Sequence, residues 1–185
     1  GPQDLDLIIC ATVTPDMAFP ATACLLQDLL GLRTIPAFDL SAGCSGFGYA
    51  LSVAESMLVG GSYKNALVVG VDVLSRITDY EDRSTCVLFG DGAGAAILGE
   101  VPEGYGFLAS ELGAEGSSGS VLQLPGGGSR MPASARSVQE RQHYIKMQGS
   151  EVFKFAVRIL DESARRVIAK ARLNPEDIHW VVPHQ

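Results

Sequence analysis

The chain has 185 residues, of which 46% are hydrophobic and 19% are charged, and its formal net charge at pH 7 is −7. Such a composition predicts a packed core and excludes a disordered chain, because many apolar side chains and few charges favour burial. The acidic balance, with a pI near 4.9, also argues against binding to the phosphate backbone, so we expect no nucleic-acid partner.

The apolar and cysteine patterns exclude two further classes of protein. No apolar run reaches the ~20 residues that span a bilayer, and the N-terminus has no signal-peptide pattern. The four cysteines and three histidines have no zinc-like spacing, and the surroundings of Cys10, Cys24, Cys44 and Cys86 resemble core. We therefore expect a cytoplasmic protein with no metal, no membrane partner and no disulfide framework.

The first part of the chain alternates between strand and helix patterns. Continuous apolar runs predict strands at 5–12, 35–40 and 66–73, and helical spacing predicts helices at 20–30 and 47–59. The first run, LDLIICAT, suits a strand that is buried on both faces. A β-α-β-α-β order with short connections is typical of a parallel α/β layer, so the fold class is α/β.

The patterns after residue 73 are less regular. A glycine-rich turn leads into a strand over 89–98 (FGDGAGAAIL), but it lacks the spacing and the lysine of a phosphate-binding loop. We predict further strands at 105–113 and 178–182, a loop over 113–137, and an amphipathic helix over 150–173. A change of subdomain is expected near residues 101–106.

The stretch from Phe38 to Leu51, FDLSAGCSGFGYAL, contains a possible nucleophile. Small residues flank Cys44 and allow the backbone to turn sharply beside the thiol. A helix that begins just after Cys44 would direct its N-terminal amides at the sulfur, which favours a thiolate nucleophile. Cys44 could equally be an inert core cysteine, because free cysteines are among the most buried residues. A histidine that follows a strand's carboxyl end, as His184 does, occupies a position where α/β folds place chemistry.

Six segments together resemble the β-ketoacyl-acyl-carrier-protein synthase III family, whose members have the thiolase fold. In chain order they are ATVTPDMAFPATA, FDLSAGCSGFGYAL, DRSTCVLFGDGAGAAIL, LPGGGSR, MQGSEVFKFAVR and WVVPHQ. Each segment alone is modest, but six in the right order are specific. The resemblance implies a layered α-β-α-β-α fold of two similar halves, here an incomplete central portion, with residues 1–105 in the N-terminal half and 106–185 beginning the C-terminal half.

The resemblance also implies a reaction and its residues. The enzyme would be an acyltransferase that condenses an acyl-coenzyme A primer with malonyl-acyl carrier protein. It would act as a homodimer and need no cofactor, since the coenzyme A thioester is a substrate. Cys44 matches the acyl-accepting nucleophile and His184 the catalytic histidine. Phe19 matches a phenylalanine that closes the partner subunit's acyl pocket, and Arg83 an arginine beside the coenzyme A nucleotide. The remaining matches line the acyl pocket, its entrance or the pantetheine channel: Val13, Leu74, Phe89, Met147, Gly149 and Phe153.

The resemblance has departures and rivals. Family members are longer at both ends. The resemblance implies that the first strands and a region for the adenine end of coenzyme A precede this segment, and that the catalytic asparagine, part of the oxyanion hole and the carrier-protein site follow it. We therefore expect these 185 residues to be a fragment that is inactive alone. A related thiolase-fold condensing enzyme of a polyketide or other secondary pathway is the nearest alternative. A non-catalytic thiolase-like subunit is opposed by the presence of both Cys44 and His184, and an unrelated cysteine hydrolase would hydrolyse its acyl-enzyme without malonyl-carrier protein.

Overall fold

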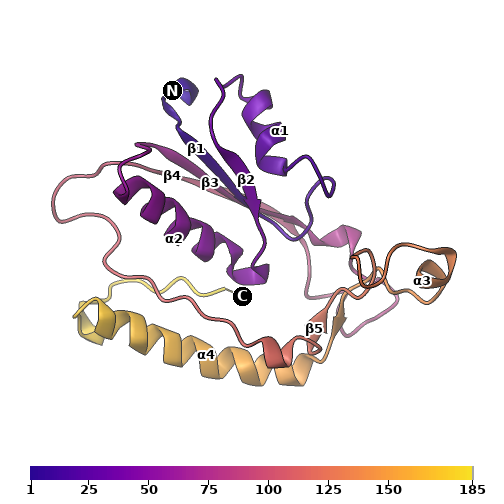
Figure 1. Cartoon of the computed structure of the whole chain (residues 1–185). Coiled ribbons are helices and arrows are strands. Elements are labelled where there is room, and N and C mark those ends of the chain that lie inside the picture. Colours follow the sequence, from indigo (N-terminus) through magenta and orange to yellow (C-terminus); the bar gives the residue numbers. More distant parts are fainter. Residues whose placement is uncertain (185) are drawn as a thin grey trace. The chain divides into compact units, whose positions relative to one another are not determined.

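The computed structural model describes residues 1–184, and its contacts divide the chain into two compact units (Figure 1). The first unit comprises Gly1–Val73 and Asp91–Leu108. The second comprises Leu74–Gly90 and the residues from Ala109 onward. The segment Leu74–Gly90 thus leaves the first unit between two of its strands. The division into halves at residue 105 stays a prediction.

The first unit contains a four-stranded mixed sheet in the order β2-β1-β3-β4. The strands are β1 (Leu7–Ala11), β2 (Ala37–Leu40), β3 (Ala66–Val73) and β4 (Asp91–Leu98). Strand β1 pairs in parallel with both β2 and β3, whereas β3 and β4 are antiparallel. The predicted parallel α/β layer is therefore confirmed, with β4 as an antiparallel edge strand.

Two helices cover opposite faces of this sheet, α1 (Thr22–Leu29) and α2 (Gly46–Val59) (Figure 1). Strand β1 alternates between them, because successive side chains of a strand point to opposite faces. Leu7 and Ile9 pack in one apolar cluster with residues of α2, while Ile8 and Cys10 pack in the other with Ala23 of α1. All five residues of β1 are buried, which confirms the prediction of a strand covered on both faces.

The second unit has little sheet. Its strands β5 (Leu122–Gln123) and β6 (Lys146–Met147) form one short antiparallel pair, and its helices are α3 (Ala135–Gln139) and α4 (Gly149–Lys170). Polar contacts join α4 to the segment before it: the side chains of Arg158 and Arg166 pair with Glu115 and Glu111 at 2.9 and 3.0 Å. The described chain also contains short 3₁₀ turns at Pro2–Asp4, Gly43–Ser45, Leu74–Arg76, Gly116–Ser118 and Pro175–Asp177.

Two predicted strands are wrong for the described residues. Neither 105–113 nor 178–182 is a strand or pairs with one. An apolar run indicates a tendency to be buried, but a strand forms only where a neighbouring strand accepts its hydrogen bonds. Trp180 and Val182 are instead 86% and 92% exposed. The region 113–137, predicted as loop, contains β5 and the start of α3.

No helix within residues 1–184 is both long enough and apolar enough to cross a bilayer.

Candidate active site

Cys44 lies in a 3₁₀ turn, Gly43–Ser45, between the carboxyl end of β2 and the start of α2. Gly43 has a φ of +57°, a left-handed conformation that residues with a Cβ adopt at a cost. The chain therefore reverses within a few residues, as its small residues predict, and Cys44 is exposed to solvent. The predicted sharp turn beside the thiol is confirmed, and the interpretation of Cys44 as a buried core cysteine is wrong for this chain.

Close packing holds the start of α2 against the sheet. A Cβ on Gly46 would lie 3.3 Å from the Cβ of Ala11 in β1, and a Cβ on Gly70 of β3 would lie 3.0 Å from the ring of Phe47. Both gaps are too tight for an added side chain without displacement of a neighbour. The two glycines therefore allow the turn that carries Cys44 to sit directly on β1 and β3.

The other cysteines occupy different environments. Cys10 is buried in β1, where desolvation, reinforced by nearby carboxylates of which Asp39 is the strongest, raises its pKa to about 11. Cys24 is exposed on α1 and donates to the carbonyl oxygen of Ala37 at 3.4 Å, and Cys86 is half-buried. Core surroundings were thus predicted correctly for Cys10 but wrongly for Cys24, which contacts the edge strand β2 and stays exposed to solvent.

An aspartate near the end of β3 fixes the segment that carries Val13. Asp72 accepts hydrogen bonds from the backbone N–H of Val13 at 2.8 Å and from the hydroxyls of Thr12 and Thr14 at 3.2 Å each. The Thr14 hydroxyl also accepts from the N–H of Val73 at 2.7 Å. Val13 thereby lies at the carboxyl ends of the parallel strands, the same sheet edge from which the Cys44 turn departs.

Phe19 lies in the loop before α1 and is 83% exposed. Asp39 of β2 caps the helix α1 that follows. Its two carboxylate oxygens accept hydrogen bonds from the N–H groups of Thr22 and Ala23 at 2.7 and 2.8 Å. A carboxylate is favoured there because the first amides of a helix have no partner within the helix. Sequence analysis did not identify Asp39 or Asp72, since both lie within apolar runs that indicated only strands.

The remaining predicted site residues belong to the second unit. Leu74 and Phe89 are half-buried and Arg83 is exposed, and all three lie on the segment Leu74–Gly90. Met147 is the last residue of β6 and Gly149 the first of α4, where Phe153 is 69% exposed. His184 is exposed beyond the last turn. Because Cys44 belongs to the first unit, its pairing with His184 stays a prediction.

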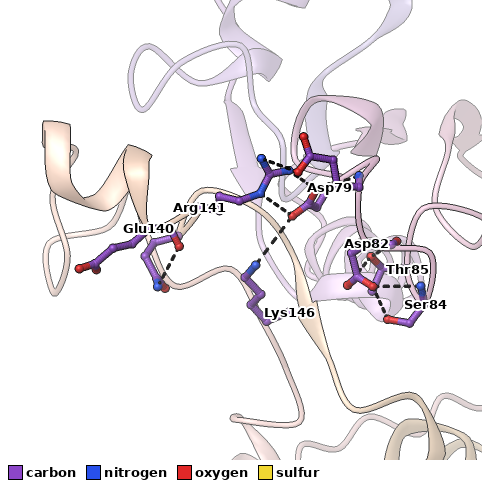
Figure 2. Close-up of polar contacts among 9 residues, drawn as sticks. Asp79, Asp82, Ser84, Thr85, Glu140, Arg141 and Lys146 are labelled. Carbon is purple, nitrogen blue, oxygen red and sulfur yellow. Dashed lines mark hydrogen bonds and ion pairs between the residues drawn. The ribbon is translucent and has the colours of Figure 1, made fainter.

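A polar network that sequence analysis missed organises the segment around Arg83 (Figure 2). Asp79 is 5% exposed and accepts hydrogen bonds from both Nε and Nη2 of Arg141, with Lys146 Nζ 4.0 Å away. These contacts, the hydrogen bond to Arg141 first, lower the pKa of Asp79 to about 2. Asp82 accepts from the backbone and hydroxyl of Ser84 at 2.9 and 2.6 Å, which lowers its pKa as well. The D-x-S-T spacing could have indicated this turn, but no local signal links Asp79 with Arg141.

Comparisons with known proteins bear directly on this arrangement. Residues 38–116, which include the Cys44 turn and the Arg83 segment, match the family described as 3-oxoacyl-[acyl-carrier-protein (ACP)] synthase III. The chain is 54% identical over 184 residues to the β-ketoacyl-[acyl-carrier-protein] synthase III of Caldanaerobacter subterraneus subsp. tengcongensis, covering all of this chain and 56% of that protein. The chain is thus similar, over its whole length, to members of the synthase III family. It spans little more than half the length of the curated relatives it matches.

Solved structures show the same similarity. The synthase III of Aquifex aeolicus is 46% identical, with a TM-score of 0.83 over 96% of this chain and 53% of that one. The priming β-ketosynthase of the R1128 polyketide pathway is 30% identical, with a TM-score of 0.82 over 96% of this chain and 52% of its own. The predicted α/β, thiolase-like fold is confirmed. Because the fold is shared with a polyketide enzyme, fold similarity alone does not separate the two pathways.

Within residues 1–184 no group of three or more histidine, cysteine, aspartate or glutamate side chains is arranged to hold a metal ion.

Proposed function

We propose that the protein carrying this chain is a β-ketoacyl-acyl-carrier-protein synthase III, an acyltransferase that starts fatty-acid synthesis. The observation that carries the proposal is the exposed Cys44 on a tight turn between β2 and α2, in a segment that matches the synthase III family. A cysteine held on such a turn can be approached by a thioester, whereas the buried Cys10, with its raised pKa, cannot serve.

The proposed reaction has two halves. The Cys44 thiolate attacks the thioester carbonyl of an acyl-coenzyme A, the carbon–sulfur bond to coenzyme A breaks, and coenzyme A leaves as the thiolate. A malonyl thioester on acyl carrier protein then loses carbon dioxide, and its enolate carbon attacks the acyl-Cys44 carbonyl, which releases Cys44. His184 would donate a hydrogen bond to the oxyanion of the enolate, an interaction typically worth ~3–4 kcal/mol in such sites. The coenzyme A thioester is a substrate, and we propose no separate cofactor.

The other predicted residues receive roles consistent with their positions. Val13, Leu74 and Phe89 would line the acyl pocket or its entrance, and Met147, Gly149 and Phe153 the pantetheine channel. Phe19, largely exposed here, would extend into the pocket of a second subunit of a homodimer. Arg83 would contact the nucleotide of coenzyme A, since its guanidinium is exposed and forms no ion pair or side-chain hydrogen bond with another of residues 1–184. The volume of the acyl pocket would select the acyl chain of the primer.

Acyl transfer to Cys44 tests the proposal directly. The protein expressed from its complete reading frame is incubated with acetyl-, isobutyryl- or hexanoyl-coenzyme A, and the acyl group is located by peptide mass spectrometry. We expect one acyl group on Cys44, no labelling of Cys44→Ala, and full labelling of the matched control Cys24→Ala, which removes the other exposed thiol. Labelling of Cys24 or Cys86, or none at all, would contradict the proposal.

The subsequent condensation separates the alternatives. Addition of malonyl-carrier protein should convert the labelled enzyme to a β-ketoacyl product and free Cys44. Release of a free fatty acid without malonyl-carrier protein would indicate a hydrolase instead. Labelling without condensation by the complete protein would favour an acyl carrier or a subunit that requires a partner.

A further inference from the structure

The segment Leu74–Gly90 connects β3 to β4 yet is folded by polar contacts of its own. The hydroxyl of Thr78, which is 2% exposed, donates to the carbonyl oxygen of Leu74 at 2.7 Å. The hydroxyl of Thr85, which is fully buried, lies 3.0 Å from a carboxylate oxygen of Asp82. Arg83 lies between these two residues in the chain. Its backbone position is therefore set by side chains that are sequestered from water.

Asp79 ties this segment to the stretch that leads into β6. Its carboxylate is bound by the Arg141 guanidinium through two nitrogens and by the N–H of Glu81 at 3.0 Å (Figure 2). A backbone hydrogen bond of 2.8 Å from Ile145 to the carbonyl oxygen of Ile77 runs beside it. Because a buried carboxylate is costly unless its oxygens are satisfied, Asp79 holds the segment in the one position where Arg141 reaches it.

Arg141 is itself held in place. Its backbone has a φ of +54°, which is uncommon for a residue other than glycine. Its guanidinium also lies 3.2 Å from Glu81 and 5.1 Å from the centre of the Tyr144 ring. Such a conformation persists only where the surrounding contacts determine it, and the contacts with Asp79 and Glu81 join Arg141 to the Arg83 segment.

From these contacts we infer that Asp79 is a positioning residue, which acts through Arg141 to align the Arg83 turn with the wall formed by Met147 and Gly149. Met147 follows Lys146, the second cation beside Asp79, and Gly149 begins α4. The Arg83 turn would then bind the nucleotide of coenzyme A, and the wall of Met147 and Gly149 would bind its pantetheine arm. Asp79 would set the distance between these two segments. This inference rests on the proposed function, and it assigns Asp79 no contact with the substrate.

The test separates positioning from general stability by using two thioesters. One is the acyl-coenzyme A that labels Cys44, and the other is the matching N-acetylcysteamine thioester, which lacks the nucleotide. For Asp79→Asn in the complete protein we expect the half-saturating concentration of acyl-coenzyme A to rise about tenfold, with a maximal rate changed less than about twofold. The half-saturating concentration of the N-acetylcysteamine thioester should not change.

Three variants sharpen the result. Arg83→Ala should show the same selective loss, because it removes the group that Asp79 positions. The exchanged pair Asp79→Arg with Arg141→Asp should recover part of the loss relative to either single change, since it restores opposite charges. Asp161→Asn, which breaks an Asp–Arg pair on the exposed side of α4, is the matched control and should behave as the unchanged protein.

An activity-independent measurement accompanies the kinetics. Cys86 is half-buried in the same segment, so a loosened tether should raise its alkylation rate in Asp79→Asn at least about tenfold. The inference would be overturned if Asp79→Asn raised the half-saturating concentrations of both thioesters equally. It would also be overturned if this variant changed neither the half-saturating concentration of acyl-coenzyme A nor the alkylation rate of Cys86. Either result would leave the proposed function intact. If neither thioester acylates the protein without substitutions, both the inference and the proposed function are wrong.

Discussion

The two units of this chain are stabilised by different interactions. In the first, β1 is buried on both faces between two apolar clusters, and buried side chains such as Leu7, Ile9 and Val68 are almost wholly inaccessible. In the second, the buried side chains among the described residues are Thr78, Asp79, Thr85 and Ser137, with Ile145 as the one apolar member. Ion pairs and hydrogen bonds join its segments, and α4 buries none of its residues.

The difference corresponds to what each unit supplies to the proposed site. The apolar unit holds Cys44 on a turn packed against the ends of β1 and β3, which suits a nucleophile that must keep one geometry. The polar unit carries Arg83 and the residues proposed for the coenzyme A channel, where charged side chains would suit a charged substrate. Four predictions test this contrast, from the largest expected effect to the smallest.

Truncation of the first unit's core should have the largest effect. Ile9→Ala, at a side chain with 0% exposure, should lower the free energy of unfolding by about 2–5 kcal/mol, because it removes buried surface and leaves a cavity. Leu29→Ala is the control, since Leu29 is 83% exposed on α1. It should change the free energy of unfolding by less than about 0.5 kcal/mol. Urea unfolding of the complete protein measures both. If both variants lost the same free energy of unfolding, the first unit would not depend on its buried apolar core.

Thiol reactivity should differ by about a hundredfold within the first unit. With its pKa near 11, Cys10 is about 0.1% thiolate at pH 8, and burial adds a steric barrier to any reagent. Cys44, which is exposed, should react with iodoacetamide at least about a hundred times faster in the folded protein. Peptide mass spectrometry over time measures each site, and denaturant should bring the two rates together. Rapid modification of Cys10 in the folded protein would mean that β1 is accessible to solvent.

Acid should weaken the second unit through Asp79. Its pKa falls from 3.8 to about 2 in the fold, so the folded state holds the proton less tightly than the unfolded state does. The stabilisation is therefore complete above about pH 4 and is lost as the pH falls through about 2. The unfolding midpoint of Asp79→Asn should lie below that of the unchanged protein above pH 4, and the gap should narrow toward pH 2. A difference in unfolding midpoint that stays constant with pH would contradict this prediction. Glu176→Gln, at an exposed residue, serves as the control.

Loss of an exposed ion pair should have the smallest effect. Arg165 lies 2.9 Å from Asp161 one helical turn away on α4, and both side chains are largely exposed. Solvent screens such a pair, so Asp161→Asn should leave the unfolding midpoint unchanged within measurement error. Thermal unfolding at low and moderate salt concentrations tests it. A clear destabilisation would show that surface pairs, and not only the Asp79 network, hold the second unit.

The sequence by itself determined most of the first unit. Strand β3 was predicted with its observed bounds, and β1, β2, α1 and α2 differ from prediction by a few residues at their ends. These elements bury apolar side chains at the spacing of their own secondary structure, so local patterns carry the information. The Cys44 turn was predictable for a related reason, because Gly43 and its small neighbours permit a conformation that larger residues resist.

Tertiary structure alone decided the polar contacts. Asp79 and Arg141 are 62 positions apart, and Asp72 and Val13 are 59, so no local pattern relates them. The run at 178–182 has the composition of a strand, yet whether it pairs depends on a neighbour that its own residues do not specify. Hydrophobic periodicity is a property of adjacent residues, whereas the partner of a buried charge is chosen only when the chain has folded and brought distant segments together.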